Sequence, residues 1–415
     1  INSVSYGQVI KGSISDASGA SIPFAKVWIK NTSHGTITNG KGQYHLDVSQ
    51  GGNYELRISS LGFESKDTIL TMVSDVYECN VVLNAVLELE EVVVTSESNK
   101  KKGKRIMKEV ISRRSGFLNT AGRYRCQTYC FTSLDKRSES KTDTTDADSD
   151  LSMSKMNITE WKSTSYFEAK NRYKDVITGF IDYTEKTENR VSVSASFSNR
   201  ELGEPSGGVE SNPYIFINGI QDADINIFKN LIHAPTISQR PLTSPLAYNA
   251  FLYYNFYLEE TFLEGDELIY EIRVEPIFKQ EALFSGTLYI KSESYEPEGY
   301  ELAVNKGAMG YFKEMRIVCS YENFEGRLLP IKREFVYLIE EKNLFSENTF
   351  IHGNSRISHD KYHFEFDDSN RRFWLEEKVF EPRAFDQDTS FWQEIRPFYL
   401  EGEELAFIQT QDSIT

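Results

Sequence analysis

The chain has 415 residues and a mass of 47.7 kDa, a length that predicts two or three domains. Its 62 acidic residues outnumber its 46 basic residues, and the formal net charge of −16 argues against a general nucleic-acid binder, which needs an excess of Lys and Arg. Aromatic residues make up 13% of the chain and, together with Val, Ile and Thr, favour sheet over helix.

The chain begins at Ile1 without a signal peptide, as a processed secreted protein would. No run approaches the roughly 18–20 apolar residues that a spanning helix needs. The four cysteines Cys79, Cys126, Cys130 and Cys319 permit three full pairings, and buried free thiols are the simplest interpretation. Cys126 and Cys130 would lie roughly 13 Å apart on one face of a strand, too far to bond each other.

Residues 1–86 are predicted to form a small all-β domain. Turn signals at Asp16–Gly19, Gly40–Gly42 and Gly51–Gly52 separate short alternating stretches, in the rhythm of a β-sandwich. The expected strands are Gln8–Ser15, Ala25–Lys30, Tyr44–Val48, Tyr54–Ser60 and Asn80–Leu83.

The landmarks of this domain occur in the order found in the carboxypeptidase-regulatory-like domain family, which it resembles. They are Gly12, Gly19, Ile22-Pro23, Ala25-Lys-Val27, the turn from Thr36 to Tyr44, Leu56 and Leu61-Gly62-Phe63. The resemblance implies a transthyretin-like β-sandwich with no catalytic residues of its own. It also implies a Bacteroidetes cell envelope, because the domain is common at the N-terminus of outer-membrane proteins there.

Residues 87–122 are predicted to be a linker strand and a helix. The stretch Leu87–Thr95 resembles the segment that follows this domain in SusC-type TonB-dependent transporters, which implies partner contact through Glu91, Val92, Val93 and Val94. An exposed edge strand is the alternative, because β-branched residues flanked by Glu are typical of one. No SusC-type plug follows.

A helix is predicted over Lys100–Leu118, because apolar residues such as Ile106 and Val110 recur at helical spacing. Its basic residues include Lys100, Lys104 and Arg105. They form either a solvated face or a contact with acidic lipid head groups, which attract such clusters.

Residues 123–415 are predicted to form a second, mainly antiparallel β domain with a few helices. A short helix is expected within 213–232 and a helical turn within 244–254, while 138–155 should be a long mobile loop. The meander strands are expected at Tyr254–Phe262, Glu267–Pro276, Phe284–Ser292, Gly299–Asn305, Lys313–Glu322, Leu328–Leu338 and Lys361–Asp367, preceded by strands at Arg123–Leu134, Trp161–Phe167 and Asn171–Ile177.

This second region resembles the DUF5686 proteins of Bacteroidetes, which pair it with a carboxypeptidase-regulatory-like domain. The matching pieces are Ser244-Pro-Leu246, Tyr254-x-Phe256-x-Leu258-Glu259, Phe284-Ser-Gly286-x-Leu288-Tyr-Ile290 and Ser390-Phe-Trp392-x-Glu394-Ile-Arg396-Pro397. The strand rhythm also resembles the curved half-barrel of lipoprotein carriers such as LolA. Family members usually continue into an outer-membrane β-barrel, whereas this chain stops at Thr415, so it is either a barrel-less member or the soluble part of one.

No catalytic or metal motif occurs in the sequence, so we expect a non-enzymatic protein without cofactor or metal. His359 and His363 are four residues apart, but on a strand they would lie roughly 13 Å apart. The aromatic residues Trp374, Trp392 and Tyr399 are candidates for lining a ligand site. The alternative is that such residues pack a terminal helix at Leu400–Ile408 against a sheet.

These observations predict a binding or assembly protein associated with the outer membrane, on its periplasmic or surface side. The expected partners are outer-membrane β-barrel proteins of a barrel-assembly or SusC-type complex, and the membrane surface. One alternative is a carrier or sensor with an apolar or sugar ligand in the concave face of the second domain, which a packed face would exclude. The other alternative is an enzyme with clustered carboxylates of raised pKa in a cleft.

Overall fold

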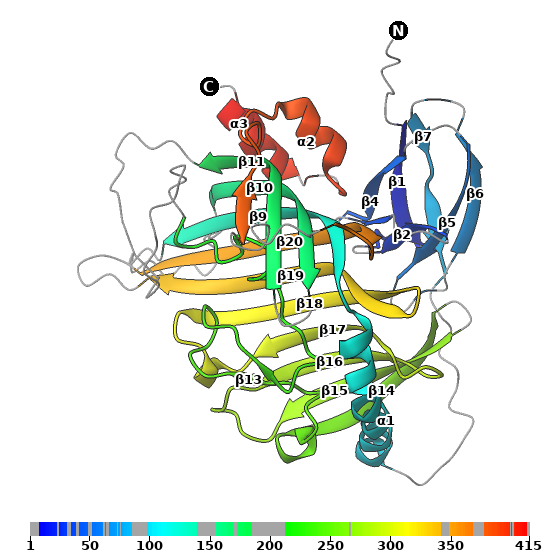
Figure 1. The fold of residues 1–415 in the computed structure, drawn as a ribbon, viewed down its shortest axis with the longest axis vertical. Helices are drawn as coiled ribbons and strands as arrows, with labels where there is room; N and C mark the ends of the chain where they lie inside the picture. Colours follow the sequence, from blue (N-terminus) through cyan, green and yellow to red (C-terminus); the bar gives the residue numbers. More distant parts are fainter. Residues whose placement is uncertain are drawn as a thin grey trace, which may run out of the picture.

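The fold was taken from a computed structural model (Figure 1). It describes residues 8–22, 25–30, 35–38, 41–48, 52–60, 63, 66–72, 74, 76–84, 98–138, 154–168, 172–184, 212–264, 267–341, 348–367, 377–398, 400 and 402–412. The predicted loop at 138–155 lies almost wholly outside these residues.

The N-terminal residues form the predicted β-sandwich of two four-stranded sheets. In one sheet, β1 (Gln8–Asp16) pairs with β4 (Gln43–Val48), β7 (Val76–Glu78) and β8 (Val81–Leu83). The other has the order β3 (Gly35–Ile37), β2 (Lys26–Ile29), β5 (Asn53–Ser59) and β6 (Lys66–Thr71). Buried residues of both sheets, including Ile14, Val27 and Leu56, form one core. Gly42 is required in its turn, since it has φ +71° and a Cβ there would lie 2.4 Å from the Ile14 oxygen.

The second domain is built on one eleven-stranded sheet, the predicted curved half-barrel. Seven consecutive strands form an antiparallel meander, as the sequence predicted. They are β14 (Tyr254–Glu264), β15 (Glu267–Pro276), β16 (Phe284–Lys291), β17 (Pro297–Val304), β18 (Phe312–Phe324), β19 (Arg327–Glu341) and β20 (Thr349–His363). The sheet continues through β9 (Tyr124–Ser138), β10 (Ser154–Glu168), β11 (Arg172–Thr184) and the short parallel strand β21 (Lys378–Phe380).

The last meander strand differs from its prediction. A strand was expected at Lys361–Asp367, whereas β20 ends at His363, beyond an irregularity that begins at Asp360. β20 pairs along its length with β9, so that Ile357 lies opposite Cys130. The sequence pattern did not predict this strand, because both faces of β20 are covered. Buried polar residues such as Arg356 therefore break the alternation of apolar and polar residues that marks a strand with one exposed face.

Among the described residues, three helices complete the second domain. α1 (Asn99–Thr120) confirms the predicted helix and packs on β14 at Gly103, where a Cβ would lie 2.7 Å from the Phe256 oxygen. α2 (Thr389–Ile395) is capped by Asp388, whose carboxylate accepts a hydrogen bond from the Phe391 N–H. α3 (Gly402–Asp412) corresponds to the predicted terminal helix. In the parts of the chain described, no helix combines the length and apolarity needed to cross a membrane.

The short helix expected within residues 213–232 is wrong. The structure has turns there, followed by β12 (Leu231–Ile232), which pairs with β13 (Leu242–Thr243). Asn212, Asp222 and Asn226 accept hydrogen bonds from nearby backbone N–H groups, and these local bonds compete with helix formation. The helical turn expected within 244–254 is present as η1 (Ala250–Leu252). A second such turn is η2 (Lys306–Ala308).

Candidate functional site

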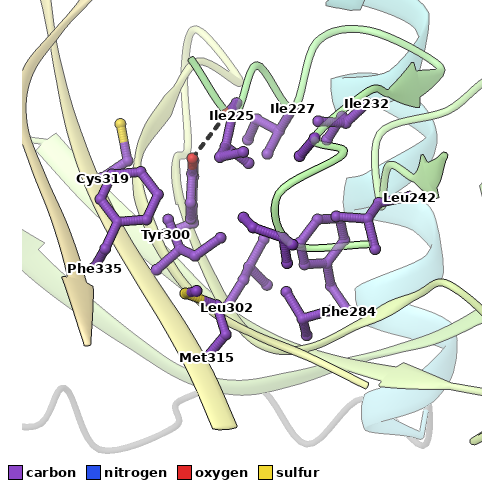
Figure 2. Packing of buried hydrophobic residues seen from close by; sticks show 14 of the residues in the cluster. Ile225, Ile227, Ile232, Leu242, Phe284, Tyr300, Leu302, Met315, Cys319 and Phe335 are labelled. Carbon is purple, nitrogen blue, oxygen red and sulfur yellow. Dashed lines mark hydrogen bonds between the residues drawn. The ribbon is translucent and has the colours of Figure 1, made fainter. Parts of the chain in front are cut away.

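The concave face of the large sheet is filled by residues 212–250 (Figure 2). Ile225, Ile227 and Ile232 of this segment belong to the same buried cluster as Phe284 and Leu302 of the sheet. The Tyr300 hydroxyl, on β17, donates a hydrogen bond to the Ile225 carbonyl oxygen over 2.9 Å. Among the described residues the concave face is therefore packed, the arrangement that counts against the carrier alternative.

A buried polar network fixes this segment to the sheet. The carboxylate of Asp224 accepts hydrogen bonds from the Tyr173 hydroxyl of β11 and, over 3.3 Å each, from the Arg333 guanidinium of β19 and the Lys229 ammonium. A second carboxylate, that of Asp175, accepts a hydrogen bond of 2.7 Å from the Ile220 backbone N–H. Because each acidic group meets donors from another element, the network joins the segment to the sheet as buried charges require.

His359 extends the network to two more strands. Its Nε2 lies 3.1 Å from Arg333 Nη1, and its Nδ1 lies 3.1 Å from the Thr128 hydroxyl. Burial and the neighbouring guanidinium hold the pKa of His359 well below its usual value. The imidazole is thus neutral and accepts a hydrogen bond from Arg333.

Cys126 borders this network through the Thr128 hydroxyl and is not activated as a nucleophile. Burial raises the pKa of Cys126 to about 12, so its side chain stays a thiol at neutral pH. The adjoining cavity measures about 30 Å³ and has room for roughly one water molecule. In the described parts of the chain no three His, Cys, Asp or Glu side chains gather as metal ligands. The four cysteines are free and buried, as predicted.

The outer face of the sheet holds the C-terminal helices through buried ion pairs. Glu160, on β10, accepts hydrogen bonds from Arg396 Nε (2.9 Å), Arg396 Nη2 (2.5 Å) and the Tyr129 hydroxyl (2.5 Å). Arg356, on β20, donates a hydrogen bond of 2.5 Å to Glu404 of α3. These contacts place α2 and α3 on the face opposite residues 212–250.

Of the predicted site residues, Trp392 is described, and it is fully buried in a cluster with Tyr129, Phe131, Ile158 and Ile408. This position agrees with the packing alternative, while ligand binding by the aromatic residues stays a prediction. Trp374, Tyr399, Glu91, Val92, Val93 and Val94 lie outside the described residues.

One end of the β14–β15 hairpin exposes large apolar side chains. The exposed fractions are 71% for Tyr248, 66% for Leu252, 44% for Ile277 and 49% for Phe278. The two stretches are adjacent because the Ile277 N–H donates a hydrogen bond of 2.8 Å to the Tyr253 carbonyl oxygen. We call these four residues the apolar end. Sequence reasoning missed it, although Tyr248 and Leu252 fall within the most apolar window of the chain, residues 245–258.

The basic side of α1 flanks the apolar end. The Lys104 ammonium lies 5.5 Å from the ring centroid of Phe251, and the Lys100 ammonium lies 5.7 Å from that of Tyr257. The exposed basic residues of this side are Lys100, Lys101, Lys104, Arg105 and Lys108. Exposed apolar and cationic groups therefore occur together at this end of a strongly acidic chain.

Two family models match the chain. Residues 10–94 match the CarboxypepD_reg-like domain, and residues 206–352 match DUF5686, a family of unknown function. Both resemblances expected from the sequence are confirmed, and their order along the chain is the expected one. No curated protein matches the chain.

Several solved structures match part of the chain at low sequence identity. A LolA superfamily protein from Nitrosomonas europaea is 9% identical, with a TM-score of 0.24, over 65% of this chain and 97% of that one. A DUF1329 family protein from Desulfovibrio piger is 9% identical, with a TM-score of 0.26, over 67% and 100%. A putative outer-membrane lipoprotein-sorting domain from Vibrio parahaemolyticus is 9% identical, with a TM-score of 0.25, over 65% and 96%. At these TM-scores the likeness carries no functional argument.

Proposed function

From the premise that this chain joins a CarboxypepD_reg-like domain to a DUF5686 region, we propose that it is a non-enzymatic binding and assembly protein of the outer membrane. It docks on an anionic membrane surface and presents its other surfaces to an outer-membrane β-barrel partner. The observation that carries the proposal is the apolar end beside the basic side of α1.

The apolar end and the basic side of α1 contribute to the free energy of membrane binding in different ways. Burying apolar side chains in the interface gains about 25 cal/mol per Å². Each Lys or Arg near an anionic surface adds about 1 kcal/mol, which salt screens. Lys100 and Lys104 lie beside the aromatic residues rather than apart from them, so both contributions act at one place.

Vesicle co-sedimentation with the full chain tests the membrane contact. We expect binding to vesicles of phosphatidylcholine with phosphatidylglycerol, weaker binding at high salt, and little binding to phosphatidylcholine alone. The double substitution Leu252→Glu/Phe278→Glu should abolish sedimentation. The matched control is Ile69→Glu/Val82→Glu, which adds the same two charges at exposed residues of β6 and β8, in the sandwich (Figure 1). Equal sedimentation of both variants with the wild type would disprove the docking surface.

The partner is tested separately, by affinity purification from detergent-solubilised envelopes followed by mass spectrometry. Stoichiometric recovery of outer-membrane barrel proteins supports assembly, and Val93→Pro should reduce it, because proline removes the backbone N–H that the proposed pairing with a partner strand needs. Recovery of the chain alone would contradict the assembly role. It would not affect the proposed membrane contact, which the vesicle experiment tests separately.

A further inference from the structure

The sandwich is attached to the large sheet at separate points, because the two domains have separate hydrophobic cores. Lys26, on β2, forms an ion pair with the buried carboxylate of Glu298 on β17, which also lies 3.2 Å from the Lys291 ammonium. Trp28, two residues further along β2, belongs to a buried cluster with Phe324 of β18. β2 therefore provides one attachment.

The junction between the domains is incompletely packed. A cavity of about 290 Å³ remains between them, the volume of roughly ten water molecules at about 30 Å³ each. Gly35, Thr36 and residues 45–47 of the sandwich form one wall, and side chains of β9, β10 and β20 with residues 395–397 form the other. A junction of polar contacts around a cavity permits relative motion of two domains, which only a large hydrophobic interface would prevent.

Residues 396–398, which we call the strap, provide the second attachment. The Pro397 carbonyl oxygen accepts a hydrogen bond from the Thr36 hydroxyl of β3, and Phe398 forms an isolated antiparallel bridge with Tyr44 of β4. β3 and β4 are edge strands of the two sandwich sheets. The strap therefore contacts both sheets of the sandwich at their edges.

The same strap lies in the core beneath the C-terminal helices. Phe398 belongs to the buried cluster that contains Trp392 of α2 and Ile408 of α3. The Arg356 guanidinium lies 4.4 Å from the Phe398 ring centroid and donates a hydrogen bond of 2.5 Å to Glu404 of α3. Figure 1 shows the sandwich and these two helices as separate parts of the molecule. They are joined through one residue, which the sandwich contacts on its backbone and the helices on its side chain.

We propose that the strap is a relay that couples the position of the sandwich to the order of α2 and α3. While the sandwich is seated on the sheet, β3 and β4 hold Pro397 and Phe398 in place, and Phe398 completes the core under the helices. When a partner draws the sandwich away, the strap loses these contacts and the helices loosen. Such coupling is reciprocal, so displacing α3 also weakens the seat of the sandwich. The relay does not depend on membrane docking at the apolar end.

Hydrogen exchange of the full chain, read by mass spectrometry, tests the relay from the side of the sandwich. Thr36→Val removes the donor to the strap and keeps the size of the side chain. We expect exchange in the strap and in α3 to become about three- to tenfold faster, the effect of one lost hydrogen bond. The matched control is Thr71→Val, which removes a hydroxyl that donates to Asn53 Oδ1 over 2.8 Å at the opposite edge of the same sheet. It should leave α3 at the wild-type rate.

The reciprocal test starts from α3. Glu404→Gln removes the charge that pairs with Arg356, and it should speed exchange in β3 and β4 as well as in α3. Glu403→Gln, at an exposed position of the same helix, is its control and should leave β3 and β4 unchanged. The strands β15 and β16 should keep wild-type rates in every variant.

Three results would overturn the proposal. An unchanged α3 in Thr36→Val, or unchanged β3 and β4 in Glu404→Gln, would show that the sandwich and the helices move independently. An equal rise of exchange in β15 and β16 would show that the whole fold had become less stable, without a specific connection through the strap.

Discussion

Arg333 Nη1 lies 3.1 Å from His359 Nε2 in the buried network beneath residues 212–250. A guanidinium is always a donor, so this contact requires a neutral imidazole. The fold therefore contains a histidine that can be protonated only by breaking the network that holds the segment on the sheet.

Acid should destabilise the protein through His359. The pKa of this residue is lowered on folding, so the unfolded chain binds the extra proton below its own pKa of about 6.5. Above that pH the free energy of unfolding keeps its full value. Below it, the free energy of unfolding falls by up to about 1.4 kcal/mol for each pH unit. Urea unfolding at pH 7.5, 6.5 and 5.5 measures this, and His359→Gln should flatten the dependence.

The matched control for this prediction is His363→Gln, because His363 is an exposed histidine near the end of the same strand. It should keep the wild-type slope. If His359→Gln also kept the wild-type dependence of the free energy of unfolding on pH, other groups would be responsible for the loss of stability in acid.

Removing one member of the Glu160–Arg396 pair should be costly. Glu160→Gln leaves the Arg396 guanidinium buried without its counter-charge, and such losses cost about 3–5 kcal/mol. The double variant Glu160→Leu/Arg396→Met should recover much of the stability, because no unpaired charge remains. Chemical denaturation measures the free energy of unfolding of both variants. Hydrogen exchange in α2 should be faster in the single variant than in the double variant. Additive losses in the double variant would contradict this account.

Two glycines of α1 should respond oppositely to alanine. Gly103→Ala places a Cβ 2.7 Å from the Phe256 carbonyl oxygen, so α1 must move off β14 at a cost of about 1–3 kcal/mol. Gly116→Ala meets open space in the same helix and should stabilise by about 0.5–1 kcal/mol. Thermal unfolding of both variants tests the docking of α1, which would be refuted if Gly103→Ala were as stable as Gly116→Ala.

The cysteines should be inert in the folded protein. Burial raises the pKa values of Cys126 and Cys130 to about 12, and their thiols lie inside the packed sheet. An aromatic disulfide reagent should label them at the rate of unfolding and rapidly in denaturant. Fast labelling of either residue in native buffer would show that the sheet opens locally near β9.

The sandwich, the meander and α1 could be predicted from the residue pattern alone. Each follows from local information: turn residues at short intervals, alternation along strands, and apolar residues at helical spacing. The same local patterns indicated the basic side of α1, and the cysteines were correctly expected to be free. These features do not depend on which distant segments meet.

What covers each face of the sheet, by contrast, depends on contacts between distant segments of the chain. The pairing of β20 with β9, the packing of residues 212–250 against the concave face, and the Glu160–Arg396 pair all join residues more than 30 positions apart. Local patterns do not record such contacts, since the polar residues that make them resemble surface residues until both faces are covered. For the same reason the apolar end and the cavity between the domains emerged only when hairpin ends and strand faces from separate parts of the chain came together.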